Sequence, residues 1–338
     1  MRTKVVIIGG GPSGLLLSRL LSLENIDNMV LEKQTREHVQ GRIRAGVLEN
    51  GTIDMLRLAG VSNRLDSEGF KHNGIELSFK NHGFRIDLKK LTDKHVTVYG
   101  QTEVTKDLYE IIEKENCNII NSAEDVLPQN IGKNNSFVTF KKNGIEKKIT
   151  CDFIVGCDGY HGISRKVIPD NLTNIFERVY PFGWLGILSE TPPVKEELIY
   201  ANHGNGFALA SMRNQNLSRY YIQTSLGDNI EDWSDKRFWE ELKRRLPMEA
   251  SETIITGPSI EKSIAPLRSF VCEPMNWNNL FLVGDAAHIV PPTGAKGLNL
   301  AVSDVYYLFN GFKKHYLFGD NKDLKNYSTK ALSRVWKA

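Results

Sequence analysis

Three glycines near the N-terminus have the spacing of a phosphate-binding turn. Gly9, Gly11 and Gly14 form a G-x-G-x-x-G pattern between the apolar run 5–8 and a helix-length apolar stretch. Gly9 allows the tight turn, Gly11 lets the backbone approach a pyrophosphate, and Gly14 lets helix and strand pack closely. The helix N-terminus offers unpaired N–H groups to the phosphates. Glu32 ends a second apolar run where an acid would bind ribose hydroxyls, so the segment predicts dinucleotide binding. A glycine turn without a ligand is the alternative for the motif alone.

Two later segments place an acid and a glycine directly after a buried strand. Asp158 follows the run 151–156, and Asp285 follows 280–283. Open α/β sheets bind ligands beyond the carboxyl ends of their strands, so Asp285 could accept a hydrogen bond from a ribitol hydroxyl. A capping role is the alternative for Asp158 taken alone. A predicted helix then opens with N–H groups that could face the flavin pyrimidine carbonyls: Gly297, Leu298 and Asn299.

The elements that must position these residues are of two kinds. Residues 5–32 predict a βαβ unit of a parallel sheet. Alternating apolar residues over 73–90 predict a hairpin with its turn at Asn81-His82-Gly83, and 126–150 predicts a meander. Short aromatic-rich strands over 176–225 predict an antiparallel sheet. Helices are predicted at 101–115, 235–246 (capped by Ser234 or Asp235), 296–312 and 324–336.

This order predicts an α/β fold with two lobes. A Rossmann-like FAD-binding domain would be interleaved with a mostly antiparallel substrate domain. We expect the FAD-binding domain at 1–72, 96–179 and 268–319, and the substrate domain at 73–95 and 180–267.

Composition excludes several other classes of function. The formal charge is +3, from 43 Lys and Arg against 40 Asp and Glu, which gives no reason to propose a nucleic-acid partner. The four cysteines form no C-x-x-C pair and no His cluster accompanies them, so no metal site is predicted. No apolar run is long enough for a signal peptide or a membrane span. We expect a cytoplasmic protein.

Together, the three strand-end segments resemble the class A flavoprotein aromatic hydroxylases. Further segments narrow the resemblance to the hydroxylases of 4-hydroxybenzoate within that family, and it runs from residue 1 to the end of the chain. These segments are residues 41–46, 99–105, 179–186, 198–203 and 263–270.

The resemblance implies FAD bound non-covalently, reduction by NADPH or NADH, and O2 as co-substrate. It implies hydroxylation of 4-hydroxybenzoate at C3 to 3,4-dihydroxybenzoate through a flavin C4a-hydroperoxide, as part of aromatic catabolism, in a homodimer. A related hydroxylase of another small aromatic acid is the alternative activity.

The resemblance also assigns residues to the substrate. Ser211, Arg213 and Tyr221 would hold the carboxylate, with a surface Arg beside structural hydroxyls as the alternative interpretation. Tyr200 would bond the phenol and help to ionise it. The backbone carbonyl of Pro292 would lie near that phenol, and Thr293 and Ala295 would line the pocket. His72 would lie at the end of a proton network, although a lone His is more often structural.

The cofactor positions follow from the same resemblance. For FAD they are Ser13, Glu32, Lys33, Arg44, Gln101, Asp158, Arg219 and Asp285. For the nicotinamide cofactor they are Arg42, Arg44, His161 and Arg268. Lys33 and Arg36 could favour a 2′-phosphate while Glu37 would repel one, so we expect NADPH rather than NADH.

The chain ends at Ala338, whereas the resemblance implies that the family continues beyond this point. The continuation would supply a second active-site tyrosine and part of the dimer contact. Residues 320–338 would then begin an incomplete C-terminal helical interface region. A flavoprotein that binds substrate with uncoupled turnover, or none, is therefore a third hypothesis.

Overall fold

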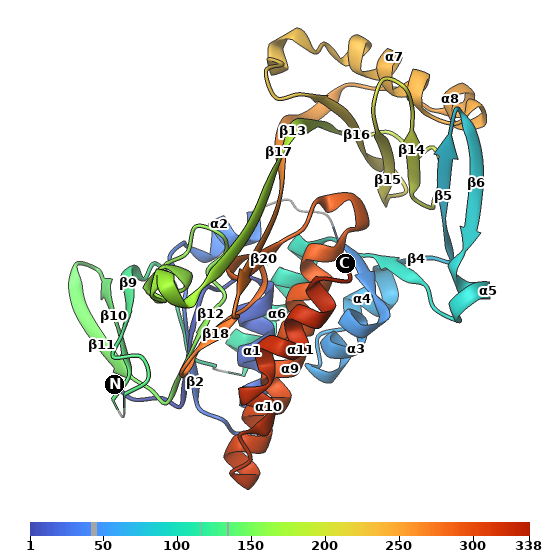
Figure 1. The fold of residues 1–338 in the computed structure, drawn as a ribbon. Coiled ribbons are helices and arrows are strands. Elements are labelled where there is room, and N and C mark those ends of the chain that lie inside the picture. The colour runs from blue at the N-terminus through green and yellow to red at the C-terminus, as the bar shows by residue number, and fades with distance from the viewer. Residues whose placement is uncertain (42–45, 116, 134) are drawn as a thin grey trace. The chain divides into compact units, whose positions relative to one another are not determined.

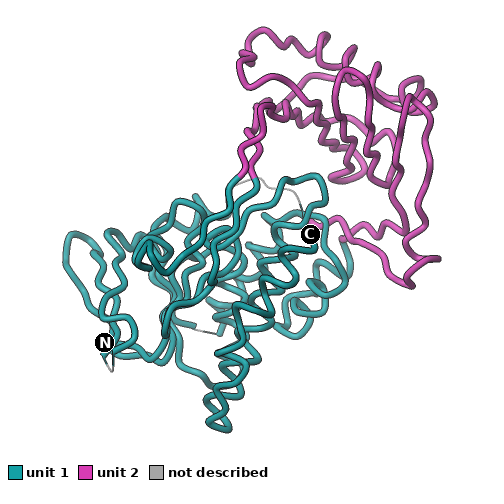
Figure 2. Tube along the Cα trace, viewed as in Figure 1, with its two compact units in different colours: residues 1–68, 100–177, 269–338 teal, residues 69–99, 178–268 magenta. Residues whose placement is uncertain are grey.

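Two units alternate along the chain (Figure 2). The computed structural model describes residues 1–41, 46–115, 117–133 and 135–338. Unit 1 comprises residues 1–68, 100–177 and 269–338, and unit 2 comprises residues 69–99 and 178–268. β13 (Asn174–Ser189) and β17 (Ser259–Glu273) are the long strands that carry the chain from one unit to the other and back. The two-lobed, interleaved fold predicted from the sequence is confirmed.

Unit 1 is built on a sheet with the strand order β18-β19-β12-β1-β2-β8. β1 pairs in parallel with β12 and β2, and β12 pairs in parallel with β19. All four residues of β1 are buried, as expected of a parallel strand covered on both faces. Figure 1 shows helices on one side of this sheet and the meander β9–β11 on the other.

The elements of unit 1 have the following bounds. The strands are β1 (Val5–Ile8), β2 (Asn28–Leu31), β3 (Val47–Glu49), β8 (Ile119–Ile120), β9 (Glu124–Gln129), β10 (Phe137–Lys142), β11 (Ile145–Thr150), β12 (Phe153–Gly156), β18 (Asn276–Trp277), β19 (Leu280–Leu282) and β20 (His288–Ile289). The helices are α1 (Pro12–Leu23), α2 (Arg36–Gly41), α3 (Asn50–Leu58), α4 (Asn63–Glu68), α6 (Gln101–Lys114), α9 (Lys296–Phe318), α10 (Lys322–Lys325) and α11 (Tyr327–Val335).

The long helix α9 organises the C-terminal part of unit 1. It packs against α1 and α3, and α10 and α11 pack back on it. Residues 320–338, expected to begin a separate interface region, therefore lie in unit 1. No helix in the described ranges is long and apolar enough to cross a membrane.

Unit 2 contains the mostly antiparallel sheet, in which β14 and β5 pair in parallel. Its strand order is β13-β16-β15-β14-β5-β6, with β17 beside β13, and helix α7 covers one face. The remaining elements are β4 (Phe70–His72), β5 (Gly74–Phe79), β6 (His82–Asp87), α5 (Leu88–Thr92), β7 (Val96–Val98), β14 (Ile199–Asn202), β15 (Ala208–Asn214), β16 (Leu217–Ser225), α7 (Asp235–Arg245) and α8 (Met248–Thr253).

The hairpin β5–β6 turns one residue earlier than predicted. Phe79 pairs with His82, so Lys80 and Asn81 form a two-residue turn, and both have a positive φ. This is the turn type whose twist matches that of the flanking strands, and Asn tolerates the conformation well. His82 and Gly83 accordingly belong to β6. The predicted cap of α7 is Ser234, whose hydroxyl accepts the N–H of Arg237.

The β1–α1 turn gives a prediction about stability. Gly9 has a φ of +109°, and a Cβ there would lie 2.3 Å from the carbonyl oxygen of Cys157, whereas a Cβ on Gly11 would have no atom within 4 Å. We expect Gly9→Ala to lower the free energy of unfolding of the FAD-free protein by about 3 kcal/mol or more. Gly11→Ala should lower it by about 1 kcal/mol or less. Urea unfolding followed by circular dichroism measures both, and equal losses would contradict this account of the turn.

Candidate functional site

Three loops meet at one edge of the unit 1 sheet because their strands end in register. Ile8 of β1 lies beside Gly156 of β12, which lies beside Leu282 of β19. The glycine turn, Asp158 and Asp285 follow these strand ends directly, and Glu32 follows the neighbouring strand β2. The structure therefore brings the three predicted dinucleotide segments together at the carboxyl edge, where open sheets bind ligands.

The glycine turn leaves room and free donors for a phosphate. Helix α1 has Gly11 as its N-cap and no side chain that caps it, so its first N–H groups are open to a ligand. Glu32 is buried and fixes the turn: its carboxylate accepts the N–H of Gly10 at 2.6 Å and that of Gln34 at 2.7 Å. Ser13 is buried in the first turn of α1, beside the thiol of Cys157.

Asp158 combines the two roles considered for it. Its Oδ2 accepts the N–H of Ser164 at 2.8 Å, which closes the loop after β12. Its Oδ1 is buried and has no hydrogen-bond partner among the described residues, and burial raises the pKa of the carboxyl. A buried polar atom without a partner is costly, so a ligand hydroxyl at Oδ1 would relieve it.

The start of α9 presents backbone N–H groups. Ala295 precedes the helix with a φ of +50°, an uncommon conformation for alanine, and no side chain caps the helix. Gly297 and Leu298 are half-buried in its first turn. Asn299 is buried, and its side chain holds the preceding segment: it donates to the carbonyl of Val47 and accepts the N–H of Glu49, both at 2.9 Å.

These features fit FAD. The open glycine turn suits a pyrophosphate, Glu32 lies at the end of the second strand, and Asp158 and the half-buried Asp285 lie at the neighbouring strand ends. Gln101 is half-buried at the first position of α6. Arg44, also predicted to contact FAD, lies outside the described residues together with Arg42.

The basic residues predicted to bind the nicotinamide cofactor or its 2′-phosphate are not equivalent. Lys33 and His161 are exposed. Arg36 instead contacts both carboxylate oxygens of Glu113, at 2.5 and 2.6 Å, and its guanidinium lies over the ring of Tyr109. This ion pair is partly exposed and therefore weak, so Arg36 could bind a 2′-phosphate by leaving Glu113, and its role in favouring NADPH stays a prediction.

In unit 2, strand register places the predicted substrate residues on one face of the sheet. Tyr200 lies opposite Leu209, Leu209 opposite Tyr221, and Ser211 opposite Arg219. Directly paired residues project to the same face, and so do alternate residues of a strand. Tyr200, Ser211, Tyr221 and Arg219 therefore share the face opposite α7.

Arg213 joins this group. It forms a hydrogen bond with Tyr221, and burial together with the nearby charge of Arg219 lowers the pKa of its guanidinium. Its Nε is buried without a partner in the described structure. Arg219 forms an ion pair with Glu261 at 3.0 Å, although its own Nε is also buried without a partner there. Arg268 is half-buried on β17. A guanidinium with an unpartnered Nε, on a face with two hydroxyls, can receive a small carboxylate.

Burial affects the two proton-carrying candidates of unit 2 in opposite directions. Burial raises the pKa of Tyr200 to about 12, so its hydroxyl keeps its proton at neutral pH. Burial lowers the pKa of His72 despite the nearby Glu197 and Glu196. Both ring nitrogens of His72 lack partners among the described groups, and its side chain is buried on β4. Each side chain is thus neutral and able to exchange a proton.

The remaining predicted substrate residues belong to unit 1. Pro292 and Thr293 are exposed in a short 3-10 turn before α9, and Ala295 is half-buried. Sequence reasoning missed Asp304 on α9 and its partner His288, which lie beneath the Asp285 turn. The available signal was a single acid within the apolar stripe of α9, between Ala301 and Val305.

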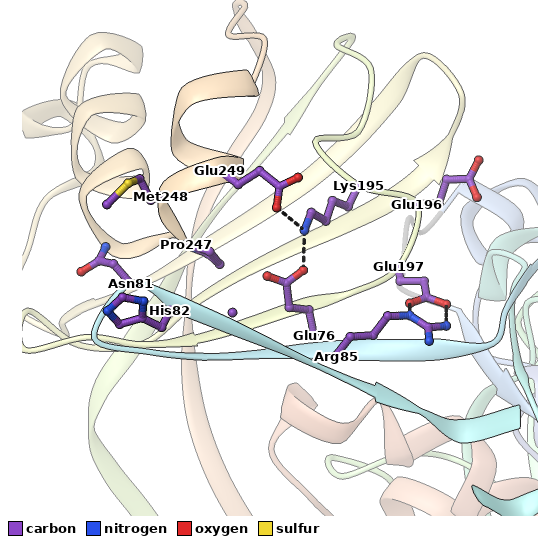
Figure 3. Close-up of a pocket in the computed structure, with 11 residues that line it drawn as sticks. Glu76, Asn81, His82, Arg85, Lys195, Glu196, Glu197, Pro247, Met248 and Glu249 are labelled. Carbon is purple, nitrogen blue, oxygen red and sulfur yellow. Dashed lines mark hydrogen bonds and ion pairs between the residues drawn. The ribbon is translucent and has the colours of Figure 1, made fainter. Parts of the chain in front are cut away.

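A charged pocket of about 580 Å³ in unit 2 is separate from these residues (Figure 3). Its charges pair internally: Lys195 lies between Glu76 and Glu249, at 2.7 and 3.3 Å, and Arg85 binds Glu197. Glu76 also alternates with Leu77, which pairs with Tyr200, so it lies on the other face of the sheet.

Comparison with known proteins agrees with the geometry. The pattern of the FAD binding domain family matches residues 2–338. The chain is 53% identical to the p-hydroxybenzoate hydroxylase of Acinetobacter baylyi over 339 residues, covering all of this chain and 84% of that protein. It is 25% identical to an uncharacterized aromatic compound monooxygenase of Bacillus subtilis, covering 91% of this chain and 61% of that protein.

Solved structures show the same fold at low identity. The p-nitrophenol 4-monooxygenase of Pseudomonas putida is similar with a TM-score of 0.82 and 18% identity, over 99% of this chain and 89% of that one. A probable FAD-dependent monooxygenase of Pseudomonas aeruginosa gives a TM-score of 0.83, also at 18% identity, over 99% and 92%. The chain belongs to the FAD binding domain family and, within it, to the class A flavoprotein hydroxylases.

Proposed function

We propose that this protein hydroxylates 4-hydroxybenzoate at C3. The substrate, O2, NAD(P)H and a proton would give 3,4-dihydroxybenzoate, NAD(P)+ and water. The observation that carries the proposal is Arg213, whose buried Nε lacks a partner on the sheet face that also bears Tyr200. The 53% identity to a p-hydroxybenzoate hydroxylase over the whole chain supports the same activity.

The carboxylate of the substrate fits the environment of Arg213. A buried carboxylate needs a cation and further donors, because transfer of an unpaired charge from water is very costly. Arg213 would supply the charge, and Ser211 and Tyr221 on the same face would supply hydroxyl donors. Arg219 is already paired with Glu261, so its charge is largely spent within the protein.

The phenol of the substrate would bind near Tyr200. Because Tyr200 keeps its proton at neutral pH, its hydroxyl can donate a hydrogen bond to the phenol oxygen and stabilise the phenolate. The phenolate has more electron density on the ring carbon beside it, which makes that carbon the better nucleophile. His72 is neutral and can accept the departing proton on a ring nitrogen. We propose Pro292, Thr293 and Ala295 as further residues that contact the substrate.

FAD, when bound and reduced by NAD(P)H, activates O2 and supplies the oxygen atom that the ring receives. Ser13, Glu32, Gln101, Asp158 and Asp285 are the residues proposed to hold it. NADPH as the donor, with His161 and Arg268 in its site, remains a prediction. So do a homodimer and a cytoplasmic location.

The first experiment measures NADPH oxidation in air by FAD-loaded protein, with and without 4-hydroxybenzoate. We expect oxidation stimulated by the substrate, with 3,4-dihydroxybenzoate formed in the amount of NADPH consumed. Stimulated oxidation that yields mainly H2O2 would indicate a binding flavoprotein without coupled turnover. No stimulation despite bound FAD would contradict the substrate, and a panel of other small aromatic acids would follow.

Arg213→Ala should weaken binding of 4-hydroxybenzoate by about 100-fold or more, because a charge-assisted contact of ~3 kcal/mol is removed. The Kd is measured by the absorbance change of bound FAD, and FAD affinity itself should not change. Arg245→Ala is the matched control, because Arg245 is a buried arginine on α7, at the opposite face, bound to the carbonyl of Gln223. That variant should lose stability but not substrate affinity. Equal Kd values for wild type and Arg213→Ala would reject the assignment.

Tyr200→Phe removes one hydroxyl and keeps the ring. The rate of NADPH oxidation in the presence of substrate should stay within about a factor of ten of the wild-type rate. The proposed role of Tyr200 lies in ionising the phenol for hydroxylation, which comes after the flavin has been reduced. Dihydroxy product per NADPH should fall below about half, with H2O2 making up the difference, because the phenolate loses a stabilising donor. Undiminished coupling in this variant would show that Tyr200 has no part in ionising the phenol.

A further inference from the structure

A buried carboxylate lies beneath the turn that carries Asp285. Asp304, on α9, is 1% exposed. Its Oδ2 accepts the N–H of Gly284 at 3.0 Å and lies 2.7 Å from Nε2 of His288, which is equally buried. One oxygen atom therefore binds the first and the last residue of the segment 284–288, and Asp285 lies between them.

This contact fixes the shape of the turn. Gly284 has a φ of +60°, so its N–H is set by a backbone conformation that other residues rarely adopt. Ala287 donates its N–H to the carbonyl of Gly284, and Arg165 donates to the carbonyl of Ala286 at 2.7 Å. With Asp304 holding both ends, the position of the half-buried Asp285 is determined by hydrogen bonds from beneath and from the side.

The contact with Asp304 favours the protonated form of His288. Burial alone would lower the pKa of His288, but the carboxylate of Asp304 raises it above its ordinary value, with a smaller contribution from Asp285. Cys157 and Tyr327 also face Asp304, and the hydroxyl of Tyr327 is already donated to the carbonyl of Leu282 at 2.7 Å. A buried ion pair costs desolvation energy and often adds little stability, so its presence is better explained by what it positions.

The same helix is anchored to a second element. Asn299, in the first turns of α9, binds the backbone of Val47 and Glu49 and the hydroxyl of Thr52. Asp304 lies five residues further along α9 and binds the Asp285 turn. The helix whose open N-terminus is proposed to face the flavin is thereby held at a fixed distance from the strand-end acid proposed to bind the ribitol.

We propose that Asp304 is a positioning residue for FAD. It acts through Gly284 and His288, and it sets the spacing between Asp285 and the N-terminus of α9 to the spacing that one FAD molecule requires. The proposal rests on FAD binding, which the family establishes, and not on the identity of the aromatic substrate. Its test therefore uses neither substrate nor NADPH.

The experiment measures the Kd of FAD for apoprotein, by quenching of flavin fluorescence, in wild type, Asp304→Asn and Asp304→Ala. Asparagine keeps one acceptor oxygen for the N–H of Gly284, and alanine keeps none. We expect the Kd to rise about tenfold for asparagine and further for alanine. The visible circular dichroism of bound FAD should change as well, because the ribitol and the ring would no longer be held together.

Two further variants separate positioning from general stability. Asn28→Ala removes a buried side chain that binds Ser18 and Ser22 at the opposite end of β2, so it should lower the Tm of the apoprotein and leave the FAD Kd unchanged. His288→Gln keeps a donor for Asp304 but removes the charge, and should raise the Kd by about threefold or more. If the Asp304 variants do not fold, His288→Gln decides the question in their place. The proposal would be overturned if Asp304→Asn bound FAD with the wild-type Kd and only its Tm were lowered, as in Asn28→Ala. The same result for His288→Gln would overturn it where the Asp304 variants do not fold.

Discussion

The parallel register of β19, β12 and β1 is the constraint on which the unit 1 site depends. Because Ile8, Gly156 and Leu282 are neighbours, the three loops that follow must begin side by side. Segments separated by more than a hundred residues in sequence thus converge at one edge of the sheet. Two of these segments pack tightly at Gly9, where even a methyl group would collide with the backbone of Cys157. The proposed phosphate site uses the N-terminus of α1, which has Gly11 as its N-cap and no side chain that caps it.

The arrangement of side chains in unit 2 depends on the two-residue period of a β-strand. Its strands alternate, so one face gathers Ile199, Tyr220 and Ile222 against α7, and the other gathers Tyr200, Ser211 and Tyr221. A shift of one residue in the register of β15 would move Ala208 and Ala210 out of the core and turn Ser211 into it. The apolar packing on α7 therefore determines the polar arrangement on the opposite face. Core residues far from any ligand fix which side chains a ligand can meet.

Local sequence patterns predicted many of the helices and strands, but they did not predict which distant side chains contact one another. The βαβ unit, the meander and the helices followed from local periodicity, which depends only on nearby residues. The turn at Lys80–Asn81 was misplaced because Asn81 and Gly83 are both typical turn residues, and only strand pairing decides the register. The contact of Arg36 with Glu113 was not predicted, because the two residues are 77 positions apart and no local pattern reveals such a pair. The role of Asp304 was invisible for the same reason, although its place in an apolar stripe marked it as unusual.

The charges in unit 2 indicate why the proposed chemistry would use neutral side chains around a charged ligand. A buried charge needs a partner, and among the described residues Arg213 keeps a buried nitrogen without one, on the face that also bears Ser211 and Tyr221. If Tyr200 or His72 were ionised in the resting protein, a second buried charge would require compensation. Burial instead raises the pKa of the first and lowers that of the second, so both remain neutral. A proton leaving the substrate phenol could then pass between neutral groups, and the protein would bury a new charge only while the phenolate exists.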